Sequence, residues 1–383
     1  MKKITLYFAT NRNHEGKDRW RPKSYGRKFS QDGMENLRFG KVTVQADEKK
    51  VTKCLNQRAR NDKGDGECLA GYLTGQVGSA IIRAYAEKID ANIADVEQPN
   101  AKFGSTGLFT DLQKAMRRQS DVLIFIHGFN VSWDEAVGSA LALQEMLNRP
   151  GVGDKKQKIL VVLFTWPSDG KALPFVSYKS DRSEAKGSGY AVGRGILKVR
   201  DFLIKLRDRA KHSSNDPKIL CGQSLHLLCH SMGNYVLQNA LERIQEHTTG
   251  SGLSRIFEHI FLCAPDVDED VLETNKPMGR LHEVCRSVSV YHNRGDVAMY
   301  VSDYTKGNPE RLGTGGAAHP SQLHHKVQQI DCSPIVTGIV EHSYYLWGPV
   351  NTDLRLSMDG VPHEDTRRTR ILAGNLRNVW VMT

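Results

Sequence analysis

One short segment of the 383-residue chain places a possible nucleophile where its chemistry would be favoured. Residues 229–233 (Cys-His-Ser-Met-Gly) follow the apolar run 224–229 and open a stretch with helical periodicity. A tight turn between a buried strand and a helix holds its central residue in a strained conformation, with the side chain projecting above the sheet. The free N–H groups at the helix start then face any negative oxygen formed there. Because Cys229 and Gly233 are small enough for such a turn, we predict that Ser231 is a catalytic nucleophile.

A second segment offers backbone groups that could stabilise negative charge beside this serine. Residues 127–130 (His-Gly-Phe-Asn) directly follow the apolar run 122–126. An acyl-transfer site needs two N–H donors for its oxyanion, one from such a loop and one from the residue after the nucleophile. We therefore predict that Phe129 and Met232 form an oxyanion hole through their backbone N–H groups. His127 is expected to serve the loop structurally, at the edge of the pocket.

These segments belong to a wider alternation of strands and helices. Several short runs are apolar at both even and odd positions, which is typical of strands buried on both faces of a parallel sheet. They span residues 122–126, 159–164, 224–229, 256–264 and 287–291, and 326–331 is expected to be the last strand. Helical periodicity lies between them, from the capping box 132–135 to Pro150 and over residues 184–210 and 232–247. The alternation predicts an α/β fold with a mostly parallel sheet.

The chain resembles the α/β-hydrolase family, and in particular a bacterial branch known only as an α/β-hydrolase domain of unknown function. The matching stretches are Phe-Ala-Thr-Asn-Arg at 8–12, Phe-Ile-His-Gly-Phe-Asn at 125–130, Phe-Thr-Trp-Pro-Ser at 164–168, His-Ser-Met-Gly-Asn at 230–234, Ala-Pro-Asp-Val-Asp at 264–268 and Glu-His-Ser-Tyr-Tyr at 341–345. The resemblance implies an α/β-hydrolase fold, with helices on both faces of the central sheet. It also implies a serine nucleophile followed along the chain by an acid and then a histidine, without a cofactor.

Two aspartates compete for the acid position that the resemblance implies. The family pattern places the acid after the strand that follows the Asp266 strand, which favours Asp296. Asp266 is kept as a possible pocket residue that, with Asp268 and Asp270, would cap a helix. The histidine follows the last strand in the family, which favours His342.

Other side chains are open to two interpretations. Trp166 follows the run 159–164 at the end of that strand, and either lines the pocket or is a packed aromatic residue. His319, His324 and His325 precede the last strand, and neither a helical histidine pair nor a carboxylate cluster indicates a metal site.

The favoured function is that of a serine esterase or lipase. His342 would take the Ser231 proton, Asp296 would stabilise the imidazolium, and water would release the acyl-enzyme of a small ester substrate. A phospholipase or thioesterase that acts at anionic surfaces, or a non-catalytic scaffold that binds a ligand or partner, remain alternatives.

The domain organisation is predicted as one elaborated domain over residues 1–383. Residues 1–120 would supply strands at 4–9 and 41–45 and an irregular insertion with helices at 75–98 and 108–119. Residues 121–350 would form the catalytic core, and residues 351–383 a C-terminal helix or tail.

Charge and cysteine content bear on partners and location. The whole excess of ten positive charges lies in residues 1–60, with sixteen Lys or Arg against six Asp or Glu. This segment is either an ordinary solvated surface or a contact for anionic membranes, and no nucleic-acid motif accompanies it. Seven widely spaced cysteines without a secretory signal predict reduced thiols in a cytoplasmic protein.

Overall fold

The computed structural model describes the whole chain except residues 60–61, 90–99, 119, 154–156, 169–173, 213–221, 249, 251, 300–309 and 337–340. The strands are β1 (Lys2–Thr10), β2 (Arg12–Glu15), β3 (Ser24–Phe29), β4 (Arg38–Ala46), β5 (Arg58–Ala59), β6 (Asp62–Lys63), β7 (Ile81–Ala84), β8 (Ser120–Ile126), β9 (Lys158–Thr165), β10 (Leu225–His230), β11 (Phe257–Cys263), β12 (Cys285–His292), β13 (Val327–Asp331), β14 (Arg370–Leu372) and β15 (Val379–Met382). The α-helices are α1 (Glu48–Asn56), α2 (Gly66–Val77), α3 (Gly104–Met116), α4 (Trp133–Leu147), α5 (Pro174–His212), α6 (Gly233–Glu246), α8 (Leu312–Gly315) and α9 (Gly348–Met358). Short 3₁₀ helices are η2 (Leu281–Glu283), η3 (Pro320–Gln322), η4 (Tyr344–Leu346) and η5 (Thr366–Arg368).

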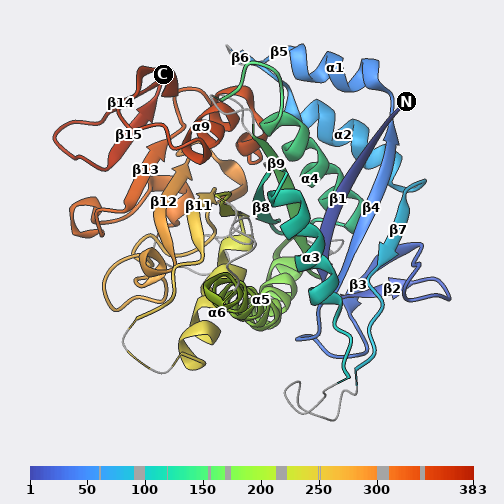
Figure 1. Cartoon of the computed structure of the whole chain (residues 1–383). Coiled ribbons are helices and arrows are strands. Elements are labelled where there is room, and N and C mark those ends of the chain that lie inside the picture. Colours follow the sequence, from blue (N-terminus) through green and yellow to red (C-terminus); the bar gives the residue numbers. More distant parts are fainter. Residues whose placement is uncertain are drawn as a thin grey trace.

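Eleven of these strands form one sheet, in the order β14-β15-β13-β12-β11-β10-β8-β9-β1-β4-β7 (Figure 1). The strands from β1 through β13 to β15 run parallel to their neighbours, while β4, β7 and β14 pair antiparallel. The predicted parallel strands are therefore confirmed, and so are the strands expected at 4–9 and 41–45. Strand β13 was expected to be the last strand, and this is wrong because β14 and β15 follow it in the chain. The carboxyl ends of β8, β10 and β12 meet at one edge, where the predicted site residues follow them.

Helices cover both faces of the sheet, as the fold class predicts (Figure 1). In β8, Leu123 and Phe125 face a core shared with α2, α4 and α9. Val122 and Ile126 face the second core, which includes side chains of α3, α5 and α6. Because successive side chains of a strand point to opposite faces, the apolar run 122–126 serves both cores at once.

Helix α5 begins at Pro174, ten residues before the predicted start at 184. Two of its glycines, Gly189 and Gly193, allow close packing against α6. A Cβ added at Gly189 would lie 2.4 Å from the Cβ of Asn239, and one at Gly193 would lie 2.9 Å from the carbonyl oxygen of Ala240. These glycines lower the helix propensity of α5, and their lack of a side chain lets α5 and α6 pack closely.

One predicted element is wrong and another is incomplete. The helix expected over 75–98 is divided, since α2 ends at Val77 and residues 81–84 form β7 against β4; residues 90–98 lie outside the described part. The C-terminal segment is more than a helix or tail, because β15 joins the sheet beside β13 and β14 pairs with it. In β15 the alternation of buried Trp380 and Met382 with half-buried residues is typical of an outer strand.

Two of the cysteines lie side by side. Cys54 at the end of α1 and Cys68 in α2 bring their Sγ atoms to 2.7 Å, inside ordinary van der Waals contact but longer than a disulfide bond. Cys54 is buried and Cys68 is exposed.

Candidate active site

Ser231 occupies a strained turn between β10 and α6. Its backbone φ is +53°, in the left-handed region that L-residues rarely adopt. The Ser231 N–H donates to the carbonyl of Cys263 at 2.9 Å, which ties the turn to the end of β11. A Cβ at Gly233 would lie 2.6 Å from the carbonyl oxygen of Ile126, so only glycine fits there. The structure therefore has the tight turn that the sequence predicts around Ser231.

Asn234 holds this turn from inside the protein. Its side-chain amide donates to the carbonyls of Ser231 at 3.0 Å and Cys229 at 3.1 Å. The N–H of Asp266 donates to the same Ser231 carbonyl at 3.2 Å. Sequence analysis quoted Asn234 within a family motif without giving it this role; its polar type at the start of an apolar helix was the available signal.

His342 and Asp296 are brought together although 46 residues separate them. The carboxylate Oδ2 of Asp296 accepts a hydrogen bond from Nδ1 of His342 at 2.7 Å. Asp296 is wholly buried, whereas the His342 side chain is 21% exposed. This arrangement fixes the imidazole tautomer with Nδ1 protonated, which leaves Nε2 free to accept a proton.

His230, the residue before Ser231, connects the serine turn to the pair of His342 and Asp296. His230 donates from Nε2 to the backbone carbonyl of His342 at 3.0 Å, and the two rings lie 4.6 Å apart. Burial holds the pKa of His230 well below its usual range, and neighbouring His342 lowers it further. His230 is therefore a neutral bridge between the turn and the His342 loop. The sequence did not predict this role.

The loop after β8 is fixed closely against the serine. A Cβ at Gly128 would lie 2.7 Å from the Cβ of Ser231. The buried carboxylate of Asp181 accepts from the Asn130 N–H at 3.2 Å and from the Ser168 hydroxyl at 2.8 Å. Arg12, also buried, donates to the Val131 carbonyl at 2.7 Å.

The roles of three of these residues were not predicted. Ser168 and Arg12 lay in quoted family stretches, whereas Asp181 was noted only as a residue near the strand end at Trp166.

The two backbone N–H groups predicted as oxyanion donors flank the serine in different segments. Met232 directly follows Ser231, and Phe129 directly follows Gly128. Within the part of the chain that the structure describes, neither N–H donates a hydrogen bond. Both groups are therefore available to a negative oxygen, and the start of α6 adds the positive end of a helix dipole.

His127 and Trp166 stack on each other behind the loop. Their rings are nearly parallel with centroids 5.4 Å apart, and the Trp166 indole N–H donates to the His127 carbonyl at 3.0 Å. Burial lowers the pKa of His127 to about 3, with a smaller effect from nearby Arg12. His127 is consequently neutral, and both side chains are buried.

Asp266 is buried beneath the turn but has partners other than His342. Its carboxylate accepts from the Tyr178 hydroxyl at 2.8 Å and lies 3.5 Å from Nε of Arg311. It was expected to cap a helix with Asp268 and Asp270, and that prediction is wrong. Residues 265–280 form successive turns, because Asn275 adopts a left-handed φ of +66° and Pro277 follows.

Some of the basic charge in residues 1–60 has an internal partner. Arg38 forms ion pairs with Glu87 and Asp32, and Lys41 pairs with Asp111. This reduces the charge that the segment can offer to an anionic surface.

The described residues contain no group of three His, Cys, Asp or Glu side chains arranged to hold a metal ion. Burial raises the pKa of the Cys229 thiol well above its usual value, so this neighbour of the serine is not an ionised nucleophile. No helix within the described ranges has both the length and the apolar character to span a membrane.

Three comparisons relate the chain to known proteins. Residues 105–354 match a family described as "Alpha/beta hydrolase of unknown function (DUF900)". An uncharacterized protein of Nostoc sp., alr1448, is 25% identical over 38% of this chain and 42% of its own length. Among solved structures, lipase B of Aspergillus fumigatus is similar at 9% identity and a TM-score of 0.30, over 63% of this chain and 52% of the lipase. The chain spans about half or less of the length of each of these two proteins.

Proposed function

Because the chain belongs to the family of α/β hydrolases of unknown function, we propose that it is a serine hydrolase that cleaves carboxylic esters. The proposed triad is Ser231, His342 and Asp296. The observation that carries the proposal is the 2.7 Å hydrogen bond between buried Asp296 and His342, in a loop bonded to the residue before the strained serine. A histidine whose ring is oriented by a buried carboxylate is the base that a serine hydroxyl needs for acyl transfer, which supports the proposal.

The first half of the reaction forms an acyl-enzyme. Nε2 of His342 accepts the Ser231 proton as Oγ attacks the ester carbonyl carbon, and the resulting imidazolium is stabilised by Asp296. The carbonyl oxygen becomes negative and receives hydrogen bonds from the N–H groups of Met232 and Phe129. His342 then gives its proton to the departing alkoxide, so the alcohol leaves.

The second half returns the enzyme to its starting state. Water enters, His342 takes one of its protons, and the hydroxide oxygen attacks the acyl carbon. Collapse of the second tetrahedral intermediate returns a proton to Ser231 and releases the carboxylic acid. The hydrogen bonds of Asp181 and Arg12 to the loop keep its donors in place without reorganisation during either half.

Covalent labelling tests the proposal directly. A fluorophosphonate probe should label the wild-type protein, and nitrophenyl acetate should be hydrolysed. Ser231→Ala should abolish labelling and lower turnover by about 10⁶-fold. Ser254→Ala, at an exposed serine outside the site, should leave both unchanged. Absence of labelling and turnover in the wild type, or a Ser231→Ala protein that retains them, would show the proposal to be wrong.

A further inference from the structure

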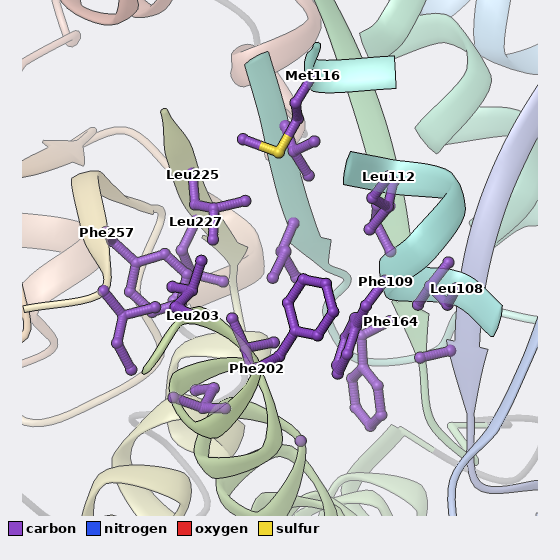
Figure 2. Close-up of a pocket in the computed structure, with 18 of the residues that line it drawn as sticks. Leu108, Phe109, Leu112, Met116, Phe164, Phe202, Leu203, Leu225, Leu227 and Phe257 are labelled. Carbon is purple, nitrogen blue, oxygen red and sulfur yellow. The ribbon is translucent and has the colours of Figure 1, made fainter. Parts of the chain in front are cut away.

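A large apolar cavity lies along the face of the sheet that α3 and α5 cover (Figure 2). Its volume is about 340 Å³, within the usual range for small-molecule sites. Its floor is formed by side chains of β8, β9, β10 and β11, and its walls by the two helices. None of the proposed triad or oxyanion residues lines it.

The cavity exists because α5 packs on α6 and bridges over the sheet toward α3. The close approaches at Gly189 and Gly193 fix α5 to α6. On the other side, the rings of Phe202 and Phe109 meet 5.3 Å apart and join α5 to α3. Figure 2 shows Phe202 and Leu203 of α5 facing Leu108, Phe109 and Leu112 of α3 across the strands. The contact between these two aromatic rings thus joins the two helices that form the walls of the cavity.

The lining requires an apolar occupant. Over most of its length the cavity meets only Ala, Val, Leu, Ile, Phe and Met side chains and one glycine. Water in such a space lacks the hydrogen-bond partners that hold buried water in proteins. An empty cavity of this size also forgoes the dispersion contacts that stabilise a packed interior.

Polar residues line only one end of the cavity, at the amino ends of β10 and β11. They are Gln113, Gln223, Ser224, Arg255 and Glu258. An occupant therefore has a long apolar part and a polar group at this end.

The charge at this end favours an anion. Glu258 is paired with Arg286 at 2.8 Å, whereas Arg255 forms no ion pair within the described residues. Arg117 and Arg118 at the end of α3, and further arginines near the end of α5, lie at the same edge of the sheet. An exposed guanidinium at the mouth of an apolar cavity is complementary to a carboxylate on an alkyl chain.

We propose that this cavity binds one medium-chain fatty acid, with its alkyl chain along the sheet and its carboxylate at Arg255. Along β8 the cavity reaches from Val122 to Ile126, about 13 Å at the rise of a strand. Within that length, each added methylene tightens binding by about fourfold, the factor that corresponds to about 0.8 kcal/mol of buried surface. The site is separate from Ser231, so binding does not depend on hydrolysis.

Calorimetric titration tests this on the full chain, with octanoate, laurate and palmitate below the concentrations at which they aggregate. Wild-type and Ser231→Ala proteins should each bind one laurate, more tightly than octanoate. Val199→Trp would fill the cavity from α5 and should weaken binding by at least about tenfold. Ile204→Trp is the matched control, because Ile204 lies on the same helix, is 47% exposed and does not line the cavity.

The carboxylate is tested by comparing laurate with dodecanol. Arg255→Gln should weaken laurate by up to about fivefold, as for an exposed ion pair, and leave dodecanol unchanged. Arg286→Gln should have a smaller effect on laurate. Equal loss for acid and alcohol would overturn the assignment of Arg255.

Circular dichroism shows whether each variant folds. If Val199→Trp does not fold, Ile124→Phe, at a residue in the floor of the cavity, takes its place. Three results would overturn the site. They are absence of saturable binding, unchanged binding in a folded cavity-filling variant, and a wild-type dimer that the cavity-filling variant alone converts to monomer. The last result would mean that a second copy of the chain covers the cavity.

Discussion

Replacing Asp296 by asparagine separates the proposed catalytic carboxylate from the other buried carboxylate at the serine turn. The amide has nearly the shape of the carboxylate, and its oxygen can still accept the N–H of Ala298, which Asp296 accepts at 3.1 Å. Its NH₂ group would then face His342 and require Nδ1 to accept a hydrogen bond. The imidazole proton would move to Nε2, where it prevents His342 from taking the serine proton.

The expected loss of turnover is about 10⁴-fold, as for a triad whose histidine is held in the wrong tautomer. This corresponds to about 5.5 kcal/mol of transition-state stabilisation, at 1.36 kcal/mol for each factor of ten. The free energy of unfolding should change much less, because the side chain keeps its volume and one hydrogen bond.

Asp266→Asn is the matched control, since Asp266 is also buried and follows the neighbouring strand. Here the change removes one of the two carboxylates paired with buried Arg311, while Asp268 remains, and this should cost about 1–3 kcal/mol of folding free energy. Turnover of nitrophenyl acetate by the folded protein should fall by less than about tenfold.

Two measurements on each variant, turnover of nitrophenyl acetate and unfolding in urea, should therefore rank the variants in opposite orders. A larger loss of turnover in Asp266→Asn than in Asp296→Asn would refute the assignment of the acid. Equal losses in both would mean that the hydrogen bond at 2.7 Å does not set the tautomer.

Four further outcomes follow from the structure. Gly233→Ala should lower the free energy of unfolding by about 1–3 kcal/mol and nearly abolish turnover, because the new Cβ would lie 2.6–2.7 Å from two backbone oxygens. The pKa of His127 falls from 6.5 to about 3 on folding, so the unfolded chain binds this proton more tightly and the folded protein loses stability as the pH drops below about 6.5. Between pH 7 and 5 the free energy of unfolding should fall by about 2 kcal/mol, as measured by urea unfolding. This loss should vanish in His127→Gln. Hydrogen peroxide should oxidise Cys54 and Cys68 to a disulfide, with peroxide reduced to water, and mass spectrometry should show the loss of two hydrogens in the peptide pair. If residues 1–60 bind anionic vesicles, the binding should weaken as salt rises from 0.1 M, where the Debye length is about 10 Å, to 1 M, where it is about 3 Å; cosedimentation that does not depend on salt would count against the contact.

The central parallel strands were predictable because burial on both faces leaves a run with no polar position. Residues 159–164 show this pattern and lie within β9. The outer strands of the sheet lack this continuous apolar run. Strand β15 has only four residues, with its inner and outer faces decided by contact with β13. The chain around residues 78–84 carries apolar residues that fit a helix or a strand, and pairing with β4 decides between them.

The residues proposed for catalysis could be chosen from the sequence because each lies in the turn or loop that follows a parallel strand of the sheet. The side chains that hold these residues in place were harder to predict from the sequence. Asp181 lies within a long helix, 51 residues from the loop that it binds, and its sequence neighbours resemble any polar helical turn. Such contacts depend on the folded arrangement of segments that are distant in the chain, which no local pattern encodes.

The position of β1 has a consequence for any attempt to isolate the hydrolase family region alone. In the intact chain β1 lies between β9 and β4, and pairs with β9 through the register Tyr7 to Val162. A fragment limited to residues 105–354 would lack β1 and leave one side of β9 as an unpaired, strongly apolar edge. Exposed edges of this kind associate with one another, so the fragment should aggregate on expression. Adding residues 1–46 in trans, which supply β1 and β4, should restore solubility by strand complementation.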